Sequence, residues 1–340
     1  MTTTFEKKLE HSHQQQYHVK TNMTLEGHPT IEGYDFEKPF DFQEFLKAYA
    51  RTGFQATNLA EGIEIVKTMQ REKVTIFLSY TSNMISSGVR DIIKYLVKHN
   101  KVQVLVTSAG GVEEDIIKVL KPFALGKFDV PGKMLFEHGI NRTGNIFIPN
   151  DRYAYFDIFM QKFLQKIYDR QKKEGKIFTP KDLIYELGLE INDESSIYYW
   201  AAKNNIPVFC PGIVDGSLGD MIVFFKQSHP DFILDVSREV MDICRLALNS
   251  EKTGGILLGG GISKHFALNA NIFKEGFDYC VYINTAEEYD GSDSGARIEE
   301  AISWGKVKAD APAVKIHCDA TIAFPLLVAG ALLEANTTPE

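Results

Sequence analysis

The sequence predicts an α/β fold, doubly wound around a mainly parallel sheet, with a helical N-terminal arm. From Val74 onward, short apolar runs rich in β-branched residues each lead into a loop of Gly, Ser, Thr or Asp, and often then into a helical stretch. The runs are apolar throughout, which is typical of parallel strands that crossover helices bury on both faces. The expected strands are TIFLS at 75–79, VQVLV at 102–106, IPVFC at 206–210, GILLG at 255–259, CVYIN at 280–284 and VKIHC at 314–318.

Helical spacing accounts for the segments between and before these strands. Apolar residues between Asp41 and Met69 recur at helical intervals with a break at Thr52-Gly53, so two helices should precede the first strand. Residues 152–174 should form a long amphipathic helix, and residues 180–187 and 195–204 two more, the last capped by Asp193 or Ser195. We read these middle helices as a cover on one domain at 31–335, preceded by a mobile arm at 1–30.

Composition excludes several classes of protein. Of 340 residues, 44% are apolar and 24% charged, which suits a large core and excludes a disordered or fibrous chain. The longest nearly uncharged stretch, 320–333, contains Pro325 and is shorter than the roughly 20 residues that cross a bilayer. A net charge of -8 disfavours nucleic acid and suits a basic protein partner.

The two remaining compositional signals concern location and metals. The first residues are charged and glutamine-rich where a secretory signal would be apolar, so we expect a cytoplasmic protein. Its four cysteines are widely spaced without a CxxC pair, which suits a reducing compartment and predicts no metal site.

Loops of small residues follow three of the expected strands. Because parallel strands end at one edge of the sheet, the loops 81–88, 107–111 and 259–261 should meet there. The run Gly259-Gly260-Gly261 lacks the GxGxxG spacing of dinucleotide sites, and alone it fits a tight turn equally well. Three such loops together favour a nucleotide cofactor bound by backbone N–H groups.

Acidic residues follow the same strands. Any one of them is most simply a helix cap or a solvated carboxylate. Gathered at one edge, they favour hydrogen bonds to ribose hydroxyls or a sheltered site for a cationic substrate such as a polyamine. The acids are Glu113, Glu114, Asp215, Asp220, Asp290, Asp293 and Asp319.

Lys306 stands apart from the other lysines because Trp304 and Gly305 precede it. A lone lysine is usually a solvated surface cation. The aromatic neighbour and the glycine make a partly desolvated amine plausible, and desolvation supplies the neutral amine that an imine intermediate requires. Spacing alone leaves both interpretations open.

Seven longer strings carry a resemblance to a known family. TSNMISSG at 81–88, TSAGGVEED at 107–115, DGSLGDM at 215–221, LGGGISKH at 258–265, YINTAEEYDGSDSGAR at 282–297, SWGK at 303–306 and FPLLVAG at 324–330 together resemble deoxyhypusine synthase over residues 33–330. The resemblance implies a Rossmann-like NAD-binding fold. It also implies NAD-dependent transfer of the 4-aminobutyl group of spermidine to one lysine of the eukaryotic translation initiation factor 5A precursor, through an imine on an enzyme lysine.

Matched residue by residue, the family pattern implies roles for the loop residues. The nucleophile falls on Lys306, and His265 is placed to accept a proton. The implied cofactor contacts are Ser82, Asn83, Met84, Ile85, Ser86, Ser108, Ala109, Gly110, Glu114, Asp215, Thr285, Ala286, Asp319 and Ala320. The implied spermidine contacts are Glu113, Glu114, Asp220, His265, Gly291, Ser292, Asp293, Glu300, Trp304 and Lys306, with Trp304 as an apolar wall for the methylene chain.

The resemblance also implies a homotetramer of two dimers, with active sites at the dimer interface and an N-terminal arm that can cover the entrance. Two other functions stay open at this stage. A homospermidine synthase would use the same imine chemistry with putrescine as acceptor. A non-catalytic paralogue would activate a partner subunit, although Lys306 and the acids argue against it.

Overall fold

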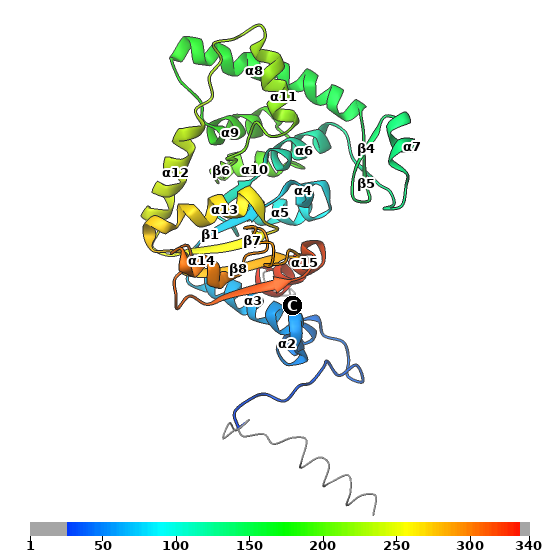
Figure 1. The fold of residues 1–340 in the computed structure, drawn as a ribbon, viewed down its shortest axis with the longest axis vertical. Coiled ribbons are helices and arrows are strands. Elements are labelled where there is room, and N and C mark those ends of the chain that lie inside the picture. The colour runs from blue at the N-terminus through cyan, green and yellow to red at the C-terminus, as the bar shows by residue number, and fades with distance from the viewer. Residues whose placement is uncertain (1–25, 334–340) are drawn as a thin grey trace, which may run out of the picture.

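The computed structural model describes residues 26–333, and a six-stranded parallel sheet lies at its centre (Figure 1). Its strands run in the order β6-β2-β1-β7-β8-β9, and every neighbouring pair is parallel. From β1 the chain moves outward to β2 and β6, returns to β7, and continues the other way to β8 and β9, so the predicted doubly wound fold is confirmed. The strands are β1 (Thr75–Tyr80), β2 (Val104–Thr107), β6 (Val208–Phe209), β7 (Thr253–Leu258), β8 (Tyr279–Asn284) and β9 (Ala313–His317).

Helices cover both faces of this sheet. Alternate strand residues point to opposite faces: Leu78 and Val281 join the core under α3, α5 and α15, whereas Phe77 and Tyr282 join the core under α12, α13 and α14. Burial on both faces explains the uniformly apolar strands. The helices are α2 (Phe42–Thr52), α3 (Phe54–Arg71), α4 (Ser82–Ser86), α5 (Val89–Lys98), α6 (Ala109–Leu120), α12 (Val236–Asn249), α13 (Gly261–Ala270), α14 (Ile298–Ser303) and α15 (Ala320–Ala331), with the 3-10 turn η1 (Ile272–Lys274).

The two helices expected before the first strand are present. Asp41 caps α2 by accepting a hydrogen bond from the backbone N–H of Glu44, and Gly53, at φ 93, separates α2 from α3. Helix α3 packs against β8 and β9. Most of the mobile arm predicted at 1–30, namely residues 1–25, lies outside the described residues, as do the last two residues of the predicted domain.

The middle of the chain forms the expected helical cover, drawn at the top of Figure 1. It consists of α8 (Asp151–Glu174), α9 (Pro180–Ile191), α10 (Ile197–Lys203) and α11 (Ser217–Lys226). The cap of α10 was predicted wrongly. Ser196 accepts hydrogen bonds from the N–H groups of Tyr198 and Tyr199, whereas Asp193 accepts one from Ser195 in the preceding turn. Asp193, Ser195 and Ser196 are all residue types that can cap a helix, and the turn that they form determines which of them does so.

A second, antiparallel sheet was not expected from the sequence. It pairs β3 (Ala124–Leu125), β5 (Ile146–Pro149) and β4 (Ile140–Thr143), and α7 (Gly132–Glu137) lies beside it at the right of Figure 1. Strands β3 and β4 are largely exposed, and β5 is apolar but only four residues long, so none shows the longer buried run that revealed the main sheet. Within 26–333, no helix is long and apolar enough to cross a membrane.

Candidate active site

The loops singled out in the sequence all follow strands of the parallel sheet and therefore lie at its carboxyl edge. The strand order reverses between β1 and β7, and the residues that follow these strands touch. Gly259, at φ +80, follows β7 and packs against Thr81, which follows β1. A Cβ atom on Gly259 would lie only 2.8 Å from Thr81 Oγ1. In open α/β sheets, the crevice at such a reversal point binds ligands.

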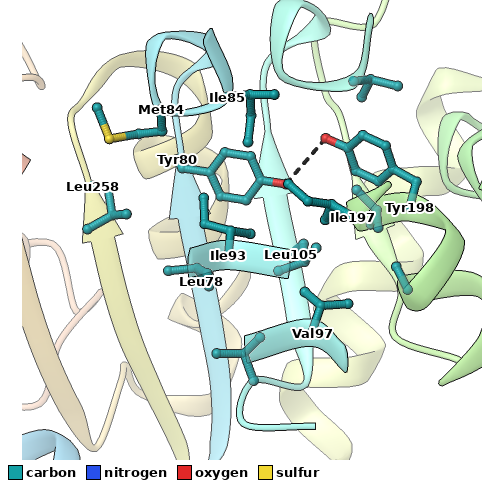
Figure 2. Close-up of a cluster of buried hydrophobic side chains, with 14 of the residues drawn as sticks. Leu78, Tyr80, Met84, Ile85, Ile93, Val97, Leu105, Ile197, Tyr198 and Leu258 are labelled. Atoms are coloured by element: carbon teal, nitrogen blue, oxygen red, sulfur yellow. Dashed lines mark hydrogen bonds between the residues drawn. The ribbon is translucent and has the colours of Figure 1, made fainter. Parts of the chain in front are cut away.

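The segment 82–86 forms the short helix α4 directly after β1, at this edge of the sheet. Met84 and Ile85 turn their side chains inward, into the apolar cluster that contains Leu78, Tyr80 and Leu258 (Figure 2). Ser82 and Asn83 remain partly or fully exposed. Met84 and Ile85 can therefore contact a ligand only through their backbone atoms.

Helix α6 begins beside α4. Its N-cap, Ser108, makes no side-chain cap hydrogen bond, and a Cβ atom on Gly110 would lie 2.7 Å from Ser82 Cβ. The N-terminus of a twelve-residue helix thus lies against α4, at a point where only small residues fit. Uncapped helix N-termini of this kind bind phosphate groups.

A buried polar network behind α6 fixes its orientation. The Tyr198 hydroxyl donates to the carbonyl of Gly111 at 2.6 Å and lies 3.3 Å from the Tyr80 hydroxyl (Figure 2). Asp115, fully buried, accepts from Arg90 Nε at 2.7 Å and from Ser196 Oγ at 2.5 Å. None of these residues was identified from the sequence, because each partner comes from a different element.

The two adjacent glutamates of α6 have different surroundings. Glu114 accepts a hydrogen bond from Ser86 Oγ, and burial raises the pKa of its carboxyl to about 7. Glu113 is buried and accepts a hydrogen bond from the N–H of Leu218 at 2.7 Å, so it caps the start of α11. Burial also raises the pKa of Glu113.

Asp215 and Asp220 lie on either side of this cap. Asp215 precedes α11 and Asp220 lies in its first turn, and both are exposed. Their negative charges contribute to the raised pKa of Glu113. Two exposed carboxylates beside a buried one form an acidic margin suited to a cationic ligand.

Lys306 lies in a second group of site residues, around α13 and α14. After Trp304 ends α14, Gly305 adopts φ +69, and the N–H of Lys306 returns to the carbonyl of Ala301 at 2.9 Å. This reversal directs the lysine inward: it is only 8% exposed, and Nζ lies 5.7 Å from the ring centroid of Trp304. Lys306 is thus buried beside the Trp304 ring.

A narrow cavity surrounds this amine. Two polar groups on its wall, the Tyr282 hydroxyl and Asp293 Oδ2, are buried without a hydrogen-bond partner among the described residues. Unpartnered buried polar groups are costly and mark places where a polar ligand would bind. The lining includes Leu268, Tyr282, Asp293, Glu300, Trp304 and Lys306.

His265 lies on α13, near the same aspartate. Its Nδ1 is 3.4 Å from Asp293 Oδ1, and its Nε2 accepts a hydrogen bond from the amide of Asn269 at 2.6 Å. This arrangement places the ring proton on Nδ1. Asn269 was not identified from the sequence, although its position four residues after His265 on one helix is a signal that could have revealed it.

Two lysines hold the loop that carries Asp293. Lys264 Nζ donates to the carbonyls of Asp293 and Ala296, and Lys315 Nζ donates to those of Ala286 and Gly295, at 3.0 and 2.7 Å. Burial lowers the pKa of both amines. The loop also meets the crevice, because Ser294 Oγ accepts a hydrogen bond from the N–H of Gly261.

The remaining expected contacts occupy the ends of β8 and β9. Thr285, Gly291, Ser292 and Asp319 are exposed, whereas Ala286 is partly and Ala320 fully buried. Asp319 caps α15 by accepting a hydrogen bond from the N–H of Thr321 at 2.7 Å. Across 26–333 we find no group of three or more His, Cys, Asp or Glu residues placed to hold a metal ion.

The family model and the relatives more than 30% identical to this chain agree on one family. The family model described as deoxyhypusine synthase matches residues 44–331. A deoxyhypusine synthase of Nicotiana tabacum is 49% identical to this chain, and the match covers 91% of each protein. A probable deoxyhypusine synthase of Methanocaldococcus jannaschii is 48% identical, and the match covers 91% of this chain and 98% of the relative. The crystal structure of an Entamoeba histolytica protein assigned to the same enzyme superposes with a TM-score of 0.65 at 31% identity, covering 88% of this chain and 96% of the other.

Proposed function

The chain belongs to the deoxyhypusine synthase family, and on that premise we propose that it transfers the aminobutyl group of spermidine to a lysine of the translation initiation factor 5A precursor, with NAD as cofactor. Membership makes it a transferase that uses a dinucleotide. The identity of the dinucleotide, the two substrates and the roles of individual residues are our proposal. One observation carries it: the buried Lys306 lines one narrow cavity together with Asp293, Glu300 and the ring of Trp304.

The carboxyl ends of β1 and β7 suit a dinucleotide. Helix α6 begins there with an uncapped N-terminus, and Gly110 and Gly259 allow the segments that follow β1, β2 and β7 to pack closely together. Glu114 and Asp215 would accept hydrogen bonds from the ribose hydroxyls. NAD bound there would accept a hydride from spermidine and later return it to the product imine.

The acidic residues suit a substrate with charged amines at its ends. Asp293 and Glu300 line the cavity beside Lys306, and Asp220 lies on the exposed margin of α11. Trp304 supplies an apolar surface for the methylene chain. Nε2 of His265 carries no proton in this arrangement and, on release from Asn269, would take up the proton that the secondary amine loses on oxidation.

Lys306 then carries the group between donor and acceptor. Its neutral amine adds to the carbon of the oxidised substrate, 1,3-diaminopropane leaves, and a C=N bond joins the aminobutyl group to Nζ. The amine of the acceptor lysine replaces Lys306 in this imine. Bound reduced cofactor would supply the hydride that converts the new imine to a secondary amine. The cofactor ends as it began, so the net reaction is a transfer.

The other two functions considered from the sequence are less well supported. Relatives from plants, animals and archaea that cover most of the chain are described as deoxyhypusine synthases, which does not favour homospermidine synthase. A non-catalytic paralogue would have no need for an enclosed Lys306 among carboxylates.

Trapping with borohydride tests the proposal. With spermidine and NAD present, the wild-type enzyme should yield a 4-aminobutyl adduct on Lys306 by mass spectrometry. Lys306→Arg should lose adduct and transfer together, because a guanidinium stays protonated. The control is Lys308→Arg, whose lysine pairs with Asp278 at 2.6 Å and should be dispensable. An adduct on Lys264 or Lys308 would contradict the assignment.

Acceptor choice needs a separate experiment. Labelled spermidine is incubated with enzyme and NAD, together with either the precursor protein or putrescine. Label should pass to the protein and not to putrescine. Preferential labelling of putrescine would establish the homospermidine activity instead.

We further propose a cytoplasmic homotetramer whose active sites lie at a dimer interface. Large apolar side chains beside the site loops are exposed, namely Val214 at 63%, Ile262 at 49% and Ile322 at 62%. Such side chains at the mouth of a site are suited to cover by a second copy. The proposed closure by the N-terminal arm involves residues outside the described part of the chain.

A further inference from the structure

Lys118 makes contacts that no step of the proposed reaction uses. It lies on α6, and its Nζ donates hydrogen bonds to three successive backbone carbonyls, those of Ile85, Ser86 and Ser87, at 2.9, 2.8 and 3.2 Å. An ammonium group has three N–H donors, so these bonds occupy its full capacity. The carbonyls lie at the C-terminal end of α4, where a helix leaves them without intrahelical partners.

Helix α6 therefore holds α4 at two points. Glu114 accepts a hydrogen bond from Ser86 Oγ, and Lys118, one turn later on the same face, binds the carbonyls around it. Helix α4 has only five residues, too few to be stable by itself. Its geometry thus depends on contacts such as these.

We propose that Lys118 is a positioning residue for the cofactor. By fixing the C-terminal end of α4, Lys118 would hold Ser82 and Asn83 so that their polar groups face the dinucleotide at the carboxyl ends of β1 and β7. This inference rests on the proposed function, because it assumes that the dinucleotide contacts residues 82–86. A cation on these carbonyls also complements the negative end of the helix dipole.

Lys118 has a second effect, on the carboxyl of Glu114. The groups that face Glu114 are Ser86 from α4, Glu113 and Lys118 from its own helix, and Tyr153 from α8. Lys118 is the one cation among them and favours the ionised carboxylate. Loss of this cation should raise the pKa of Glu114 further above its ordinary value.

The test compares Lys118→Met, Lys118→Arg and Lys121→Met by NAD titration between pH 6 and 9, with the thermal midpoint of each variant measured in parallel. Lys121 is a matched control three residues along the chain, because it pairs with Asp151 at 3.6 Å and not with α4. For Lys118→Met, we expect the Kd of NAD to rise roughly tenfold to hundredfold. The pH below which NAD binding weakens, as Glu114 becomes protonated, should be higher in Lys118→Met by about half a unit or more. Lys118→Arg, which retains charge and donors, should lie between wild type and Lys118→Met.

The outcomes separate the inference from the proposed function. A wild-type enzyme that does not bind NAD refutes the proposed function. If wild type and Lys118→Met bind NAD with the same Kd and pH dependence, the inference is wrong, even when the variant is less stable. If Lys118→Met fails to fold, Lys118→Arg is the deciding variant. The inference is overturned if Lys118→Arg binds NAD with the same Kd and pH dependence as Lys121→Met. It is supported if Lys118→Arg binds NAD more weakly than Lys121→Met.

Discussion

Replacing Glu113 by alanine should destabilise the protein, although the sequence alone places this residue with the substrate. The carboxylate of Glu113 accepts the N–H of Leu218 at 2.7 Å and replaces the side-chain cap that Gly216 lacks at the start of α11. Alanine would leave that N–H without its acceptor in a buried position.

The expected loss can be worked out from this contact. A buried N–H left without an acceptor costs about 1–3 kcal/mol, and the cost of burying the carboxylate, seen in its raised pKa, offsets part of this. We take about 2 kcal/mol as the net loss. At about 2.1 cal/mol/K per residue, unfolding 340 residues carries an entropy near 0.7 kcal/mol/K, so Tm should fall by about 3 °C.

Asp220→Ala is the matched variant, because Asp220 is an exposed acid on the same helix that Glu113 caps. It should keep Tm within about 1 °C of wild type but lower kcat/KM for spermidine roughly tenfold or more, since a carboxylate that faces an ammonium is lost. Differential scanning calorimetry and a coupled assay of NADH formation measure the two quantities. Glu190→Gln, on the surface of α9, should change neither.

Two results would refute this reasoning. If Glu113→Ala leaves Tm unchanged and only weakens spermidine use, Glu113 is a substrate ligand and not a helix cap. If Asp220→Ala lowers Tm as much as Glu113→Ala does, the acidic margin is structural.

Three further predictions follow from single features of the structure. Glu239 is buried, and its pKa is raised to about 8. The stability that its protonated carboxyl contributes is therefore complete below the ordinary pKa and is lost as pH rises through about 8. Between pH 6 and 9 the Tm of Glu239→Gln should fall less than the Tm of wild type, and equal falls would contradict this prediction. A Cβ atom on Gly295 would lie 1.5 Å from the carbonyl oxygen of Glu287. Gly295→Ala should therefore displace the loop that carries Asp293 and reduce spermidine cleavage at least tenfold. Near-normal cleavage would show that this loop adapts to the added methyl group. Light scattering should give a mass near four chains of 38.3 kDa, and a mass of one chain would refute the tetramer.

The pattern of residues along the chain was enough to predict the parallel sheet, the main helices and the edge at which the candidate site lies. Strand burial and helix amphipathicity repeat over two to four residues, so they can be read from neighbouring positions. Parallel strands then bring their following loops to one edge whatever the details of packing. The enclosed Lys306 could also be anticipated, because Trp304 and Gly305 determine the local turn.

Tertiary structure alone decided how the polar side chains of the site are used. Glu113 and Glu114 are neighbours of the same type, yet one caps a helix more than 100 residues away and the other binds a serine 28 residues before it. Lys118, Lys264 and Lys315 look like surface lysines in the sequence, but each binds backbone carbonyls of a site loop. A hydrogen bond depends on distance and direction to within a few tenths of an ångström. Residue type and spacing do not specify these quantities; they are set only when distant elements pack together.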